Sequence, residues 1–304
     1  MNANLDSQNQ NVKKHRLLIS NEEIDIEQYK KNGDYDRQKL RDKIEPWLTA
    51  VFQSEHLSLL VGTGLTIALA GNASSMKRIE FEEIIKNKAN EEAKNTDRGK
   101  ANFEDDLRVA IELLRGYEIL NDSNKDNLQK EINQQLQKLL KKILKAEKTF
   151  VKNKGNEKKL NFLKQFLISF ASRTATRDRL NIFTTNYDRI IEYGLDEAGI
   201  LTLDRFIGKL KPIMRFHRID LDYHYNPPGI RGEPRYVEGV VRYTKLHGSL
   251  DWKFEGNQII KIPLPFGVEP KDSLFENPFD KVVIYPNSSK AIETSYFPYS
   301  ELFR

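Results

Sequence analysis

The sequence contains no cysteine among its 304 residues. This absence excludes disulfide bonds, thiol catalysis and any metal site built on thiolates. The sequence also lacks an apolar run close to the ~18 residues that a membrane-spanning helix needs, and its polar N-terminus does not resemble a signal peptide. We therefore expect a cytoplasmic protein that does not contact the membrane.

A large excess of charge of one sign is missing as well. The 49 basic and 44 acidic residues leave a formal net charge of +5, which attracts anions only mildly. Nucleic-acid binding does not follow from this charge, and any such contact is expected to be weak or indirect. The chain length and the hydrophobic fraction of 38% fit one large domain, or one domain with a substantial insertion.

Three short segments each begin as an apolar strand and run into a polar turn. They are residues 59–66 (LLVGTGLT), 183–192 (FTTNYDRIIE) and 245–252 (KLHGSLDW). Doubly wound sheets build nucleotide sites at the carboxyl ends of their strands in this way. The pattern predicts an α/β fold with a Rossmann-like parallel sheet and a nucleotide site at its carboxyl edge.

The turns of these segments resemble three motifs of the sirtuin core, GAGxS, TQNxD and LHGS. They read Gly62-Thr63-Gly64-Leu65-Thr66, Thr184-Thr185-Asn186-Tyr187-Asp188 and Leu246-His247-Gly248-Ser249. Sirtuin deacylases fold a small module around a zinc ion held by four cysteines, which this chain cannot build. The closer resemblance is to the bacterial branch that lacks the zinc module, writes the middle motif as TTNYD and typically hydrolyses NAD in antiphage defence. It implies NAD as substrate and no metal.

The glycine loop predicts phosphate binding, because glycines let the backbone approach a pyrophosphate and the next helix offers free N–H groups. A tight turn from strand to helix without a ligand is the alternative, since the full GxGxxG spacing is missing. With the resemblance, the expected nucleotide-binding residues are Gly62, Thr63, Gly64, Leu65, Thr66, Thr185, Asp188, Gly248 and Ser249.

Asn186 and His247 are the candidate catalytic residues. The resemblance implies that Asn186 holds the nicotinamide ribose and positions the attacking water; the alternative is a helix cap, because a helix is predicted directly after it. His247 is the implied general base, and an imidazole with a pKa near ~6.5 suits that role. The resemblance also gives Asp188 a contact to the nicotinamide carboxamide, whereas a local ion pair with Arg189 or Arg242 is the alternative.

A loose cluster of polar residues offers a second candidate site. It consists of His217, Asp220, Asp222 and His224, and these residue types could bind a metal. Alternating polar residues on an exposed strand explain the cluster better.

Periodicity and turn signals divide the chain into an arm and a domain. Residues 1–33 are predicted to be a flexible arm, with order beginning near Asp34, and residues 34–304 to be a sirtuin-like NAD-binding domain with a helical insertion at 74–179. The sequence is expected to stop before the last βα unit of that fold. Helices are predicted around residues 40–51, 103–114, 128–144, 160–170 and 187–198, and strands at 57–61, 181–185, 214–225, 239–246, 252–262 (a hairpin) and 281–285.

The predicted insertion carries a run of lysines beside an apolar stripe. The run comprises Lys138, Lys141, Lys142, Lys145, Lys148, Lys152 and Lys154. Such a run is usually a solvated face; its functional uses would be homo-oligomer contacts or a HerA-like ATPase partner, which some relatives in this branch have. Two other functions stay open, namely a module that senses NAD or ADP-ribose without turnover and a protein deacylase.

Overall fold

The computed structural model describes residues 17–19, 21–71, 81–95, 99–152, 156–174, 176–215, 221–225, 235–269, 278 and 281–283. By its internal contacts the chain divides into two units, Met1–Leu57 and Ser58–Arg304. No helix in these ranges is long and apolar enough to cross a membrane.

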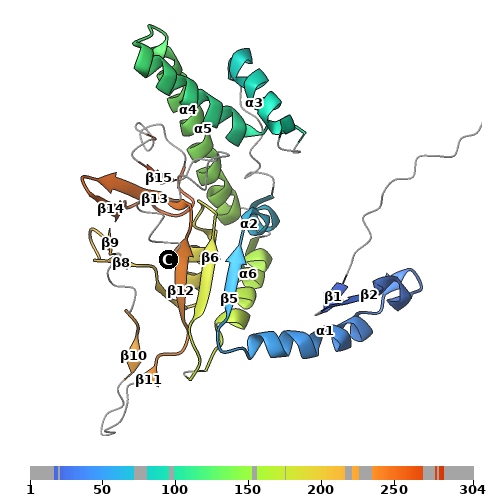
Figure 1. The fold of residues 1–304 in the computed structure, drawn as a ribbon. Helices are drawn as coiled ribbons and strands as arrows, with labels where there is room; N and C mark the ends of the chain where they lie inside the picture. The colour runs from blue at the N-terminus through green and yellow to red at the C-terminus, as the bar shows by residue number, and fades with distance from the viewer. Residues whose placement is uncertain are drawn as a thin grey trace, which may run out of the picture. The chain divides into compact units, whose positions relative to one another are not determined.

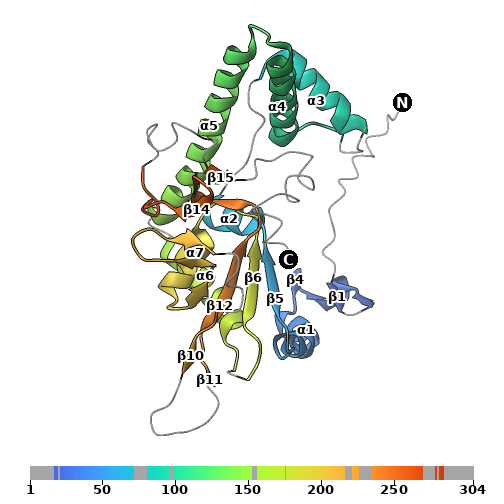
Figure 2. The same ribbon diagram turned by 60° about the vertical axis from the view of Figure 1, so that its left-hand side comes forward.

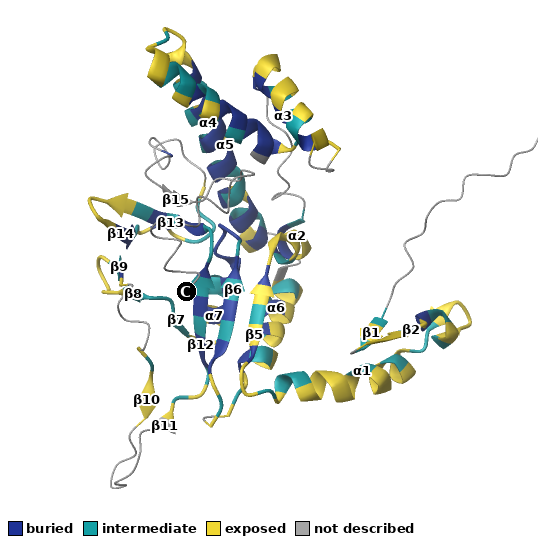
Figure 3. Cartoon of the chain, in the orientation of Figure 1, coloured by how far each residue is buried: buried dark blue, intermediate teal, exposed yellow. Residues whose placement is uncertain are grey.

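The first unit consists of two short hairpins and one long helix. Its elements are β1 (Leu17–Ile19), β2 (Glu22–Ile24), the 3-10 helix η1 (Ile26–Tyr29), β3 (Lys30–Lys31), β4 (Asp34–Tyr35) and α1 (Arg37–Phe52). The side chain of Asp36 caps α1, which continues through Pro46 and has no buried residue (Figure 3). The predicted helix is confirmed, and among the described residues regular structure is present from Leu17, before the expected start near Asp34.

The second unit is built on a four-stranded parallel sheet (Figure 1), which confirms the predicted Rossmann-like α/β fold. The strands lie in the order β5 (Ser58–Val61), β6 (Leu180–Thr184), β12 (Val240–Lys245) and β7 (Leu201–Leu203). Every neighbouring pair is parallel. The chain order β5, β6, β7, β12 thus differs from the spatial order, and the strand ends of β5, β6 and β12 are neighbours at one edge.

Helices cover one face of this sheet (Figure 2). They are α2 (Thr63–Ala70), α6 (Asn156–Ala171) and α7 (Ile190–Glu197). Gly194 lets α7 approach α6 closely, because a Cβ atom there would lie 2.6 Å from Cδ2 of Leu163. Along β6, Leu180 and Ile182 are fully buried, while the alternate residues are only half-buried on the other face.

Three helices form the insertion between α2 and α6. They are α3 (Glu83–Asn95), α4 (Phe103–Leu120) and α5 (Lys125–Lys152). Asn102 caps α4, since its Oδ1 accepts from the N–H of Asp105 at 3.1 Å and the Asp105 carboxylate accepts from the N–H of Asn102 at 3.0 Å. The sequence did not predict α3, whose buried stripe is only Ile85, Ala89 and Ala93. Small side chains of this kind give a weak periodic signal.

A second, antiparallel sheet combines strands from before and after the His247 turn. Its order is β15 (Lys281–Val283), β13 (Gly248–Glu255), β14 (Gln258–Lys261), β9 (Ile213–Met214) and β8 (Phe206–Ile207). The predicted hairpin at Gly256-Asn257 is confirmed as β13 and β14. The predicted strand over 214–225 is wrong as one element, because β9 ends at Met214 and β10 (His224–Tyr225) pairs with β11 (Arg235–Tyr236) instead. Residues 216–220 lie outside the described ranges.

Candidate functional site

The three sequence motifs meet at the carboxyl edge of the parallel sheet. Val61 and Lys245 are both register partners of Thr184, so β5, β6 and β12 end side by side. The glycine loop, the Asn186 segment and the His247 turn each follow one of these ends. This is where ligands bind in open α/β sheets.

The glycine loop passes directly into helix α2. Gly62 is the cap residue, without a side-chain hydrogen bond, and the exposed Thr63 and Gly64 open the first turn. Neither glycine has a positive φ, and a Cβ atom on either would meet no other atom within 4 Å. Neither backbone conformation nor packing within the chain therefore requires glycine here. Open space before the N–H groups of a helix start fits the close approach of a phosphate.

Asn186 lies beside this loop with one half of its amide unused. The residue is 3% exposed, and its Nδ2 donates to the Gly62 carbonyl and to Oγ1 of Thr66, both at 3.0 Å. A carbonyl can only accept, so the amide orientation is fixed by chemistry. The buried Oδ1 has no partner among the described residues. Buried polar atoms are nearly always paired, so this acceptor fits a ligand hydroxyl or a water molecule.

Helix α7 begins later than predicted, and this overturns the capping role of Asn186. The helix starts at Ile190, and the N–H of Ile190 donates to Oδ1 of Asp188 at 3.2 Å. Asp188 therefore supplies the side-chain bond at the helix start. Its Oδ2 accepts from Oγ1 of Thr66 at 2.7 Å, so the two predicted binding residues Thr66 and Asp188 bond to each other.

The alternative ion pairs of Asp188 are also wrong. Arg189 pairs with Glu147 at 2.6 Å, and Arg242 pairs with Asp222 at 3.0 Å. Asp188 is instead bonded to a hydroxyl and a backbone N–H, and both of its oxygens are engaged within the chain.

His247 lies in the two-residue turn between β12 and β13 and is half-buried. Its ring centroid is 6.4 Å from that of Tyr187. Gly248 and Ser249 begin strand β13 rather than forming a loop, and Gly248 makes the sharp turn with a φ of +85°. The Ser249 hydroxyl is fully buried with no partner among the described residues. The N–H of Leu250 donates to the Tyr187 carbonyl at 3.1 Å, which joins the His247 segment to the Asn186 segment.

Lys245, a buried residue that was not predicted for the site, bonds to the backbone of the Asn186 segment. Nζ of Lys245 is 2.5 Å from the Asp188 carbonyl, 3.4 Å from the Tyr187 carbonyl and 2.9 Å from Glu192. Tyr243 donates to the same Glu192 carboxylate at 2.8 Å. Burial, together with that carboxylate, raises the pKa of Tyr243 well above its usual value. Lys245 directly precedes the motif Leu246-His247-Gly248-Ser249, but no feature of a single sequence indicates that this lysine is buried.

Glu147 on helix α5 was not predicted to belong to the site either, although its position in the sequence indicates that it is buried. It extends the apolar stripe of α5 at helical spacing from Leu140 and Leu144, so it falls on the buried face. Burial raises the pKa of Glu147, against the lowering effect of Arg189. A carboxylate retained on such a face needs a charged partner, and the partner here is Arg189.

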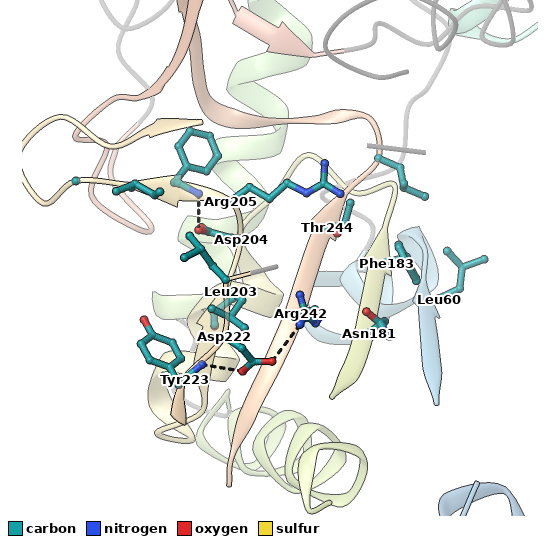
Figure 4. Close-up of a pocket in the computed structure, with 16 residues that line it drawn as sticks. Leu60, Asn181, Phe183, Leu203, Asp204, Arg205, Asp222, Tyr223, Arg242 and Thr244 are labelled. Carbon is teal, nitrogen blue, oxygen red and sulfur yellow. Dashed lines mark hydrogen bonds and ion pairs between the residues drawn. The ribbon is translucent and has the colours of Figure 1, made fainter. Parts of the chain in front are cut away.

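A cavity lies away from these residues (Figure 4). It measures about 720 Å³ and opens on the sheet face opposite the helices, lined by Asn181 and Phe183 of β6 and by Arg242 and Thr244 of β12. None of the residues predicted for the nucleotide site lines it, although Leu246 at its rim directly precedes His247.

The acidic residues of this cavity are already neutralised within the chain. Asp222 pairs with Arg179 and Arg242, both at 3.0 Å, and Asp204 pairs with Lys261. The cavity therefore offers no free carboxylate, and the motifs at the carboxyl edge define the better candidate site.

The candidate metal cluster is not assembled in the part of the chain that the structure describes. Asp222 is held by two arginines, and the ring of His224 lies 4.9 Å from that of Tyr236. No group of three histidine, aspartate or glutamate residues that could hold a metal occurs among the described residues. His217 and Asp220 lie outside them.

No family model matches this chain, and no curated protein matches it significantly.

Proposed function

We propose that this protein is a sirtuin-like NAD glycohydrolase. Water replaces nicotinamide at the anomeric carbon of its ribose, so that NAD and water give nicotinamide, ADP-ribose and a proton. The observation that carries the proposal is the buried, unpartnered Oδ1 of Asn186 beside an open glycine loop. The motif resemblance supports the choice of NAD.

Each motif has a separate task in this reaction. The N–H groups that start α2 bind the pyrophosphate, and open space at Gly62 and Gly64 admits it. Oδ1 of Asn186 accepts a hydrogen bond from a ribose hydroxyl or the attacking water. His247 accepts the proton that water loses. Thr185, Asp188 and Ser249 are further proposed contacts to NAD, with Asp188 at the nicotinamide carboxamide and itself held by Thr66 and the N–H of Ile190.

The biological setting of the proposal comes from the same resemblance. We place the protein in the cytoplasm as an effector of bacterial antiphage defence that works as a regulated homo-oligomer, with a HerA-like ATPase as a possible partner. Regulation is proposed because a cell cannot tolerate an NAD hydrolase that is always active. The lysine-bearing face of α5, which lies beside an apolar stripe, is the proposed contact surface of the oligomer.

Incubation of the purified protein with NAD, followed by nucleotide chromatography, tests the proposal. His247→Ala should lower turnover by about 10²- to 10⁴-fold, the usual contribution of a general base. Normal turnover in that variant would refute the assigned mechanism. Binding of NAD without any product would favour the sensing module instead.

A further inference from the structure

A buried carboxylate from helix α5 holds the peptide that follows Asn186. Glu147 is fully buried, and its Oε1 accepts from the backbone N–H of Arg189 at 2.9 Å and from its Nε at 3.1 Å. Its Oε2 accepts from Nη2 of the same arginine at 2.6 Å. One side chain thus fixes both the backbone and the side chain of the residue directly after Asp188.

The arginine joins a third segment to this point. Its Nη1 donates to the Leu264 carbonyl and its Nη2 to the Pro265 carbonyl at 3.4 Å, while the guanidinium lies 5.8 Å from the centre of the Phe266 ring. Phe266 in turn stacks on Tyr193 of α7, with ring centroids 4.4 Å apart. Helix α5, the 186–189 loop and the segment after β14 are therefore tied together by one ion pair.

Two charged side chains from different elements bond to the backbone of the 186–189 loop. Lys245 holds its carbonyl groups from strand β12, and Glu147 holds its last N–H from helix α5. The Asn186 amide then reaches Gly62 and Thr66 at the far end of the loop. No bond of Glu147 is directed at the glycine loop itself.

We propose that Glu147 is a positioning residue for the candidate site, fixing the 186–189 loop so that Oδ1 of Asn186 points at the reacting ribose and water. This inference rests on the proposed NAD glycohydrolase function for its kinetic consequences. Loss of Glu147 affects orientation at the reacting atoms, where small displacements cost much rate, and leaves the phosphate contacts of the glycine loop in place.

Three variants and one control separate positioning from stability. Glu147→Leu removes every bond, and Glu147→Gln keeps one oxygen for the Arg189 N–H. Glu147→Leu leaves the buried guanidinium of Arg189 without a partner, which destabilises the fold. Glu147→Leu combined with Arg189→Met therefore removes both charges and still lacks the bond to the backbone N–H of residue 189. Asp222→Asn is the control, since it disrupts a comparably buried ion pair with Arg179 away from the three motifs.

The kinetic readout is kcat against KM for NAD. The double variant should lose about 10- to 100-fold in kcat, with KM changed by less than about 3-fold. The kcat of Glu147→Gln should lie between that of the double variant and that of the wild type. Asp222→Asn should keep the wild-type kcat and have a lower melting temperature. A folded double variant with wild-type kcat overturns the inference. So does an equal loss of kcat in the control.

Hydrogen exchange measured by mass spectrometry gives a readout that does not depend on activity. Peptides covering residues 183–192 should exchange faster in the double variant, while peptides covering 58–71 should stay unchanged. If the wild-type protein does not cleave NAD, the proposed function fails and exchange alone decides the positioning role. Unchanged exchange at 183–192 then overturns it.

Discussion

Replacing Asn186 by alanine should leave the protein folded and remove NAD hydrolysis. The substitution deletes two hydrogen bonds of Nδ2, each worth about 0.5–1.5 kcal/mol, and also deletes a buried unpaired oxygen that costs about 1–3 kcal/mol. The partners left behind stay bonded, because the Gly62 carbonyl also accepts from the N–H of Leu65 and the Thr66 hydroxyl also donates to Asp188. The two effects largely cancel, so the unfolding free energy should change by no more than about 2 kcal/mol in either direction.

Asn186→Asp is the informative comparison, because it is nearly the same size as asparagine. It turns the donor that faces the Gly62 carbonyl into an acceptor and places a charge near the buried Asp188. Such a buried charge costs more than a missing amide, so the aspartate variant should be less stable than the alanine variant at neutral pH. If Asn186 served only to fill space, the aspartate variant, which is closer to it in size, would be more stable than the alanine variant.

Urea unfolding followed by circular dichroism measures both variants, and nicotinamide release measures turnover. Turnover of Asn186→Ala should fall by at least about 10²-fold, as when one preorganised polar group is removed from an active site. A stability loss above about 4 kcal/mol, the range of disrupted cores and buried ion pairs, would make Asn186 a structural residue and refute the reasoning.

Three further predictions concern the glycine loop, the buried phenol and the lysine face. Gly64→Ala should fold at least as stably as the wild type, because its Cβ meets open space within α2, yet raise KM for NAD; an unchanged KM would remove the phosphate role of the loop. Burial raises the folded-state pKa of Tyr243, so its contribution to stability is present below pH 10.0 and is lost as pH rises above it, by about 1.4 kcal/mol per pH unit. Tyr243→Phe should flatten the decline of unfolding free energy above pH 10, and identical slopes would contradict this reasoning. Reversing the charge of Lys141, Lys142 and Lys145 should weaken self-association and its salt sensitivity in light scattering, whereas a wild-type protein that is monomeric at every concentration and with its partner would refute the proposed oligomer.

Three of the four strands of the parallel sheet, and the edge where they end, could be predicted because each of these strands carries its own signal; β7 (Leu201–Leu203) was not predicted. Apolar runs that end in Gly62, Thr185 or Leu246 mark strand ends, and the carboxyl ends of parallel strands meet at one edge. The helices α4 and α5 were predicted from long apolar stripes, while α3 was missed because two of its buried residues are alanines.

The contacts within the site could not be predicted, because they depend on partners far apart in the sequence. The start of α7 was placed at Tyr187 on local grounds, yet Asn186 is drawn to Gly62 and Thr66, and Asp188 bonds to the N–H of Ile190. Glu147 lies 42 residues before Arg189, so only the helical phase of a single acid on a buried stripe hinted at the pair.

Cleavage of the bond between nicotinamide and ribose can be followed as a time course of the products formed from NAD by the purified protein, alone and with a partner ATPase. Nicotinamide and ADP-ribose should form in equal amounts, with no detectable product from a folded Asn186→Ala variant prepared in the same way. NAD that stays intact in every preparation, or products that form equally fast in the Asn186→Ala variant, would contradict the proposed function.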